Sequence, residues 1–277
     1  MNSQLDVEDL IKNCVKHGYN LLNLSFRSIF VLNPSIIQAQ HINELYLNDN
    51  KLAMPPVELC ALTNLTVLSL ENNGLTMLPG EICKLQKLNT LILNGNPLTI
   101  LPEQIASLLN LSELFISEVQ LTYLPDGICE LVNLKILSAK SNNINRFPEN
   151  FIKLKSLSWL NMCDNELLYL PTDFYNLQNL FYLNLDRNKL TNIPECLTKM
   201  KQLSSISLQF NEISELTDDT LLGLSHVSKL DLRNTSVIDG DNRWKSMDHI
   251  YIGKLGLDNE DIKIINEAND GLVLKEM

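Results

Sequence analysis

The side chains that could perform chemistry in this chain of 277 residues are scattered rather than gathered into motifs. No two histidines stand at the i, i+4 spacing with which a helix presents a pair of metal ligands. The chain has no G-x-x-x-x-G-K-[ST] or G-x-G-x-x-G motif for a phosphate group, and the IGKLG segment at 252–256 is only superficially similar to one. We therefore expect a chain that is not an enzyme and has no catalytic residue, metal ligand or cofactor.

Aromatic and charged side chains recur instead at fixed intervals, where they could bind another molecule by stacking, apolar contact and ion pairing. Trp159 and Tyr182, which stand 23 positions apart, belong to the residue types most enriched in interface hot spots. The candidate protein-binding residues are Tyr46, Ile92, Phe115, Ile136, Trp159, Tyr182, Arg187, Phe210, Glu44, Glu71, Glu113, Lys140 and Arg233.

The same 23-residue spacing organises the rest of the chain. Apolar residues open nine units at equal intervals from Tyr19 to Leu203, and two looser units open at Val227 and Met247. The unit that starts at Leu65 reads L-x-x-L-x-L-x-x-N-x-L-x-x-L-P-x-x-I-x-x-L. Self-similarity at a fixed period is the signature of a repeat architecture, so the period predicts the fold before local propensities are considered.

Within each unit, the x-x-L-x-L-x-x segment alternates apolar and polar residues, which is typical of a short strand with one buried face. The L-P-x-x-I-x-x-L segment then returns the chain through a convex arc with its apolar residues pointing inward. We expect an α/β leucine-rich solenoid, a curved horseshoe with a parallel concave sheet of about eleven strands. The variable residues around the buried leucines of each strand would point to the concave face.

An asparagine recurs after most of the expected strands, where a tight coil leaves backbone groups without partners. A side-chain amide can both donate to and accept from such groups, so these residues are expected to stack as a structural ladder. The ladder consists of Asn50, Asn73, Asn96, Asn142, Asn165, Asn188 and Asn211. Val119 breaks it in the middle of the array, and we expect a local distortion or an ordered water beside this residue.

The ends of the array carry segments that could cover the exposed core. Residues 1–18 have apolar residues at the spacing of an amphipathic helix, which we expect to be an N-terminal capping helix. The solenoid, with about eleven repeats, spans 19–257, and 258–277 form a short helical C-terminal cap. No linker interrupts the period, so all three parts are expected to form one domain.

Charge and composition limit the classes of partner that we expect for this chain. A net charge of -11 and a pI near 4.8 argue against nucleic acid, whose binding usually requires a basic surface. No apolar run reaches the ~18–20 residues of a membrane span, and the N-terminus lacks the basic start and apolar centre of a secretory signal. We expect a monomeric, cytoplasmic protein that binds a protein partner and does not insert into membranes.

The charges are distributed unevenly along the expected concave face. Acidic residues such as Glu44, Glu71 and Glu113 lie in the first half, and most basic residues, among them Arg187, lie in the second. We expect a protein ligand anchored on the aromatic pair, with its basic portion toward the N-terminal end. The alternative is that concave side chains pack on one another and bind nothing.

The full unit, with L-P-x-x-I-C-x-L at 78–85 and 124–131, resembles the 23-residue class of intracellular leucine-rich repeats. This class includes the Ras suppressor, scribble-type proteins and plant intracellular Ras-group proteins, and the resemblance covers residues from about 19 to 257. It implies a non-enzymatic scaffold or adaptor, with partners in small-GTPase, kinase or phosphatase signalling. The alternative is a secreted bacterial or protist effector that binds a host protein in the host cytosol.

Overall fold

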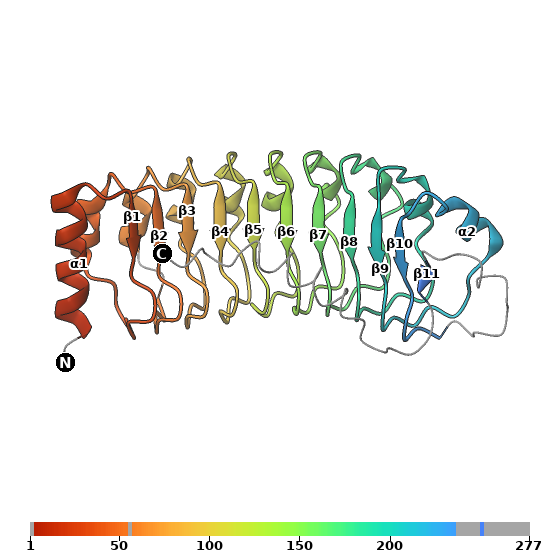
Figure 1. The fold of residues 1–277 in the computed structure, drawn as a ribbon, viewed down its shortest axis with the longest axis horizontal. Helices are drawn as coiled ribbons and strands as arrows, with labels where there is room; N and C mark the ends of the chain where they lie inside the picture. The colour runs from red at the N-terminus through yellow and green to blue at the C-terminus, as the bar shows by residue number, and fades with distance from the viewer. Residues whose placement is uncertain (1–2, 55–56, 237–249, 252–277) are drawn as a thin grey trace.

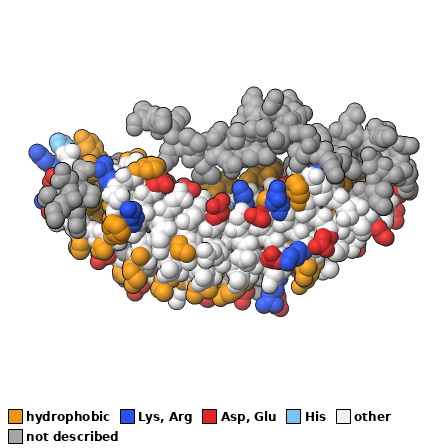
Figure 2. Space-filling model, turned by 90° about the horizontal axis from the view of Figure 1, so that it is seen from below, with side chains coloured by type: hydrophobic (Ala, Val, Ile, Leu, Met, Phe, Trp, Pro, Cys, Tyr) orange, Lys and Arg blue, Asp and Glu red, His pale blue; other side chains and the backbone are white. Residues whose placement is uncertain are grey.

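The structure, a computed structural model, describes residues 3–54, 57–236 and 250–251. Its strands pair in chain order, each parallel to the next, in one sheet of eleven strands. Figure 1 shows the strands side by side with their short return helices behind them, and Figure 2 shows that the array is curved. The predicted solenoid and its parallel sheet are confirmed.

Each strand is three residues long except the last, and in the first ten strands the middle residue is buried and its two neighbours face the concave side. The strands are β1 (Leu21–Asn23), β2 (Glu44–Tyr46), β3 (Val67–Ser69), β4 (Thr90–Ile92), β5 (Glu113–Phe115), β6 (Ile136–Ser138), β7 (Trp159–Asn161), β8 (Tyr182–Asn184), β9 (Ser205–Ser207), β10 (Lys229–Asp231) and β11 (Ile250–Tyr251). From β1 to β9 partners are 23 residues apart, so equivalent positions of successive repeats form columns across the sheet.

Most convex arcs of the described residues form short 3-10 helices of three to six residues, a length at which this tighter helix is common. In η3, η4, η5 and η8 the preceding residue is a proline with φ between -70° and -61°, which starts the turn. The arcs are η1 (Pro34–Ala39), η2 (Val57–Ala61), η3 (Gly80–Lys84), η4 (Glu103–Ser107), η5 (Asp126–Glu130), η6 (Phe151–Lys153), η7 (Phe174–Asn176) and η8 (Glu195–Lys199), and the α-helix α2 (Asp218–Gly223) follows.

The N-terminal cap is confirmed as helix α1 (Ser3–His17), which lies against β1 and η1. Val7, Ile11 and Cys14 are buried and belong to the same core as the repeats. The predicted C-terminal cap at 258–277 lies outside the described residues. Among the helices of the described part, none is long and apolar enough to cross a membrane.

The asparagine ladder is confirmed at all seven predicted positions, where the side chains are buried. Asn165 is representative: its Nδ2 donates to the carbonyls of Ala139 at 2.9 Å and Met162 at 3.2 Å, and its Oδ1 accepts the N–H of Ile144 at 3.0 Å. Each amide therefore ties its own coil to the preceding one.

The predicted distortion at Val119 is also confirmed. Gln120 adopts a φ of 65°, an additional left-handed residue that the asparagine-containing coils do not have. The N–H of Val119 donates to Asn142 Oδ1 at 3.3 Å. In the preceding coil, the N–H of Leu98 would donate to the side-chain oxygen of an asparagine at position 119. Because that residue is a valine, this N–H donates instead to the carbonyl of Asn96 at 2.8 Å. The first repeat, with Arg27 in this place, also has positive φ on both sides. The backbone thus rearranges to pair these two buried N–H groups.

Close packing between arcs leaves no space for a side chain at Gly127. A Cβ at Gly127 would lie 2.5 Å from the backbone carbonyl oxygen of Glu103, whereas a Cβ at Gly80 would meet only the side chain of Gln104 at 3.5 Å. We expect Gly127→Ala to lower the free energy of unfolding by about 1–2 kcal/mol, because backbone must move. Urea denaturation of both variants checks this, and equal stability of Gly127→Ala and Gly80→Ala would contradict it.

Candidate functional site

A hollow of about 580 Å³ lies on the concave side of the array. Residues of β5, β6 and β7 form its floor, and the loops that follow β3 to β6 line one edge. We call it the concave hollow; its lining residues are Glu71, Asn72, Asn94, Gly95, Glu113, Phe115, Ser117, Glu118, Ile136, Ser138, Lys140, Ser158, Trp159, Asn161 and Phe181. Pockets of this size, with apolar walls and a few polar groups, are typical of binding sites.

The C-terminal wall of the concave hollow is aromatic. Trp159 stacks on Tyr182 with ring centroids 5.2 Å apart and planes 5° from parallel, as expected for one column of adjacent repeats. Burial raises the pKa of Tyr182 to about 12, so its hydroxyl stays protonated at neutral pH. Phe181 completes this wall and is 50% exposed. The stack is a rigid apolar platform at the edge of an open cavity.

The N-terminal wall is acidic. Glu71 is partly buried, and burial together with the charges of Asp49 and Glu118 raises the pKa of its carboxyl group. Glu113 accepts a hydrogen bond from the Thr90 hydroxyl at 3.0 Å. Within the described ranges, no carboxylate of this wall forms an ion pair. The wall therefore presents uncompensated negative charge to a ligand.

Of the thirteen candidate binding residues, six line the concave hollow and Tyr182 stacks on one of them. The six are Glu71, Glu113, Phe115, Ile136, Lys140 and Trp159. Lys140, which is exposed, supplies the basic group of the hollow. The remaining candidates lie nearer the two ends of the array. Phe181 was missed because it precedes its strand, outside the residues that the alternating pattern assigns to the concave face.

The expected row of exposed aromatic side chains is only partly present. Tyr46 and Phe115 are buried, at 6% and 5% exposure, and Tyr46 donates its hydroxyl to Glu44 at 2.9 Å. This hydrogen bond joins two side chains of the same strand, which agrees with the alternative that some concave residues pack on one another. Phe210 is exposed but lies under the guanidinium of Arg187, 4.2 Å from the ring centroid.

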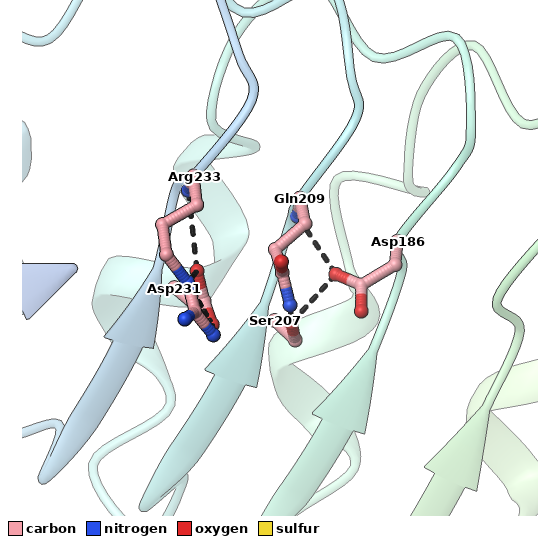
Figure 3. Close-up of polar contacts among 5 residues, drawn as sticks. All are labelled: Asp186, Ser207, Gln209, Asp231 and Arg233. Atoms are coloured by element: carbon pink, nitrogen blue, oxygen red, sulfur yellow. Dashed lines mark hydrogen bonds and ion pairs between the residues drawn. The ribbon is translucent and has the colours of Figure 1, made fainter. Parts of the chain in front are cut away.

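Arg233 also differs from expectation, because it is held in an ion pair rather than presented to a partner. Its Nη2 lies 2.5 Å from Asp231 Oδ2 and its Nε donates to Asp231 Oδ1 at 2.9 Å, as Figure 3 shows. Asp231 is 1% exposed. A buried carboxylate needs such a partner, so the charge of Arg233 is largely neutralised at its own strand.

A second carboxylate in Figure 3 was not among the candidate residues. Asp186 Oδ1 accepts the Ser207 hydroxyl at 2.6 Å and the N–H of Gln209 at 2.7 Å. Burial raises the pKa of Asp186 to about 6, because desolvation outweighs the two hydrogen bonds that favour its charged form. Asp231 raises this pKa further, while Arg187 lowers it.

We expect this group to make stability depend on pH. The pKa of Asp186 is raised from 3.8 to about 6 on folding. The contribution of the protonated carboxyl group to the free energy of unfolding is therefore fully present below pH 3.8 and is lost as pH rises through about 6. Asp186→Asn, which removes the buried charge, is expected to raise the free energy of unfolding at pH 7.5 by about 1–2 kcal/mol. The gain is expected to disappear at pH 4. Urea titrations at both pH values check this, and a gain independent of pH would contradict it.

The described residues contain no group of three His, Cys, Asp or Glu side chains that could hold a metal ion. The concave hollow is suited to binding a ligand, because one cavity combines a flat aromatic platform, apolar side chains and carboxylates. These are the components of a recognition surface.

Fold and site together define a curved repeat solenoid with a concave recognition face. Leucine-rich repeat family models match residues 171–213 and 64–85, so these segments are leucine-rich repeats. The search among curated proteins gave no match to this chain. The evidence for the class thus comes from these repeats and from the fold.

Several solved structures share the fold. A leucine-rich repeat protein of Leptospira interrogans is 24% identical, with a TM-score of 0.58, over 88% of this chain and 80% of that one. TLR13, solved with the RNA ssRNA13, is 25% identical, with a TM-score of 0.72, over 90% of this chain and 38% of that one. The ectodomain of the Arabidopsis thaliana receptor kinase GASSHO1/SCHENGEN3 was solved with Casparian Strip Integrity Factor 2. It is 26% identical, with a TM-score of 0.67, over 82% of this chain and 28% of that one.

Proposed function

We propose that the protein is a non-enzymatic scaffold or adaptor that binds a protein partner in the concave hollow. The main support for this proposal is the stacked pair of Trp159 and Tyr182 beside an acidic wall whose carboxylates form no ion pair with any other described residue. Aromatic side chains in a partly desolvated pocket supply affinity, and an uncompensated charge supplies orientation. The partner would place an apolar or aromatic anchor on the stack and a basic side chain near Glu71.

A protein fits this face better than a nucleic acid. Among its described lining residues, the concave hollow has the carboxylates of Glu71, Glu113 and Glu118 and one basic group, that of Lys140, and the whole chain carries a net charge of -11. Phosphate groups would be repelled from such a surface, since nucleic-acid affinity rests on basic side chains. The RNA in the TLR13 structure is therefore not a guide to the ligand of this chain.

Two biological settings are proposed. The resemblance to intracellular leucine-rich repeats supports a cytoplasmic adaptor in small-GTPase, kinase or phosphatase signalling. The second setting is a secreted bacterial or protist effector that uses the same scaffold to bind a host protein. Both settings use the same concave hollow.

Affinity capture tests the proposal and separates the settings. The purified chain is used as bait in lysates of its source and of candidate host cells, next to a Trp159→Ala, Tyr182→Ala double variant. Tyr175→Ala is the matched control, because Tyr175 is an exposed aromatic residue in arc η7. We expect proteins retained by the wild type and the control but lost with the double variant. A set of proteins unchanged by the double variant would refute binding at the concave hollow.

A further inference from the structure

We infer a second interaction surface, on the outer curve of the array, that fits a basic amphipathic helix of a partner protein. Five successive repeats place an apolar side chain at the same position, shortly before the arc begins. These residues form what we call the outer stripe: Val31, Met54, Met77, Ile100 and Tyr123, which are 75%, 72%, 52%, 49% and 46% exposed. Figure 2 shows hydrophobic side chains along this outer curve.

The fold does not require apolar residues at these positions. Two later repeats have Arg146 and Asn192 there, both exposed, without any change in the period of the array. The next residue along the chain, by contrast, is buried in four of these repeats, at Leu32, Leu78, Leu101 and Leu124. Single exposed apolar residues are ordinary, but a contiguous row of them marks an interaction site.

Carboxylates accompany the outer stripe. The arcs place Glu58, Glu81, Glu103, Asp126 and Glu149 in successive repeats. A pocket of about 450 Å³ brings the last three of these together with Tyr123 of the outer stripe, and Arg146 is the basic residue among its lining residues. Of these five carboxylates, the described part of the chain shows none in an ion pair.

The negative charge of these carboxylates indicates which kind of molecule could bind the outer stripe. A second copy of the chain would bring its own carboxylate row against this one, and an anionic membrane surface would meet the same repulsion. A partner with apolar and basic residues would satisfy both the outer stripe and the carboxylates. The occupant is therefore a cationic amphipathic segment of another protein.

The spacing of the repeats favours a helix. Adjacent strands lie about 4.8 Å apart, and the separation widens toward the outer curve. An α-helix advances 5.4 Å per turn, so one apolar side chain per turn can follow one apolar side chain per repeat. Five repeats would accommodate about five turns, or roughly 18 residues.

The test uses two synthetic 18-residue amphipathic peptides, one of leucine and lysine and one of leucine and glutamate, labelled for fluorescence anisotropy. We expect the lysine peptide to bind and the glutamate peptide not to bind. A Met77→Ser, Ile100→Ser variant, altered only at exposed positions, is expected to bind the lysine peptide about tenfold or more weakly. Trp159→Ala, in the concave hollow, is expected to bind it as the wild type does, so this surface and the proposed function can fail separately.

Other results would overturn the inference. Equal affinity of the wild type and the Met77→Ser, Ile100→Ser variant would show that the peptide is held by general charge attraction away from the outer stripe. Binding of the glutamate peptide would remove the role of the carboxylates. Self-association of the wild type in analytical ultracentrifugation, abolished in the variant, would assign the outer stripe to a second copy of the chain.

Discussion

Replacing Asn165 by valine is expected to lower the free energy of unfolding by about 2–4 kcal/mol. The substitution removes the bonds to Ala139 and Met162 and leaves the buried N–H of Ile144 without its acceptor. The two carbonyls each keep a bond from another ladder asparagine, so the unpaired N–H dominates the loss. Urea denaturation followed by circular dichroism measures the effect.

The chain itself provides a comparison for this experiment. At Val119 the backbone already places a valine in the ladder, with Gln120 in a left-handed conformation. Asn165→Val is therefore expected to leave the protein folded but less stable. Asn143→Val, at an exposed position, serves as the control and is expected to be nearly neutral. Equal stability of the two variants would show that the ladder contributes little.

The second large effect concerns binding. Once a partner has been captured, Trp159→Ala with Tyr182→Ala is expected to weaken its affinity at least about 30-fold, or about 2 kcal/mol. The stacked rings are partly buried and lie at the edge of the concave hollow, so their loss removes the apolar platform without opening the leucine core. Isothermal titration calorimetry of the wild type and the double variant gives both affinities.

The stability of the double variant must be measured alongside its affinity. An unchanged unfolding midpoint with weakened binding supports a contact role for the two rings. Unchanged affinity in a folded variant would show that the partner binds elsewhere.

Much of the scaffold was predictable because the geometry of the backbone determines which residue types can occupy its positions. Buried leucines, arc prolines and ladder asparagines recur at 23 residues because each coil poses the same packing and hydrogen-bonding problem. Even the exception at Val119 followed from the missing amide. The register that stacks Trp159 on Tyr182 followed from the same period.

The local environment of the site was less predictable. The period places Tyr46 and Arg233 on the concave face, but it does not reveal that the first is buried beside Glu44 or that the second pairs with Asp231. These outcomes depend on side-chain contacts within and between strands. Phe181 was missed because it precedes the three residues of its strand, so the alternation did not assign it to the concave face. The scaffold is thus set by a repeated pattern, and the site by contacts that are not repeated.

Hydrogen–deuterium exchange of the partner complex tests the central claim most directly. If the partner binds in the concave hollow, backbone amides of β5, β6 and β7 and of the loop at 117–118 are expected to become protected, while arcs η3 to η7 keep the exchange rates of the free protein. Protection confined to the arcs, with unchanged exchange across the concave hollow, would contradict the claim.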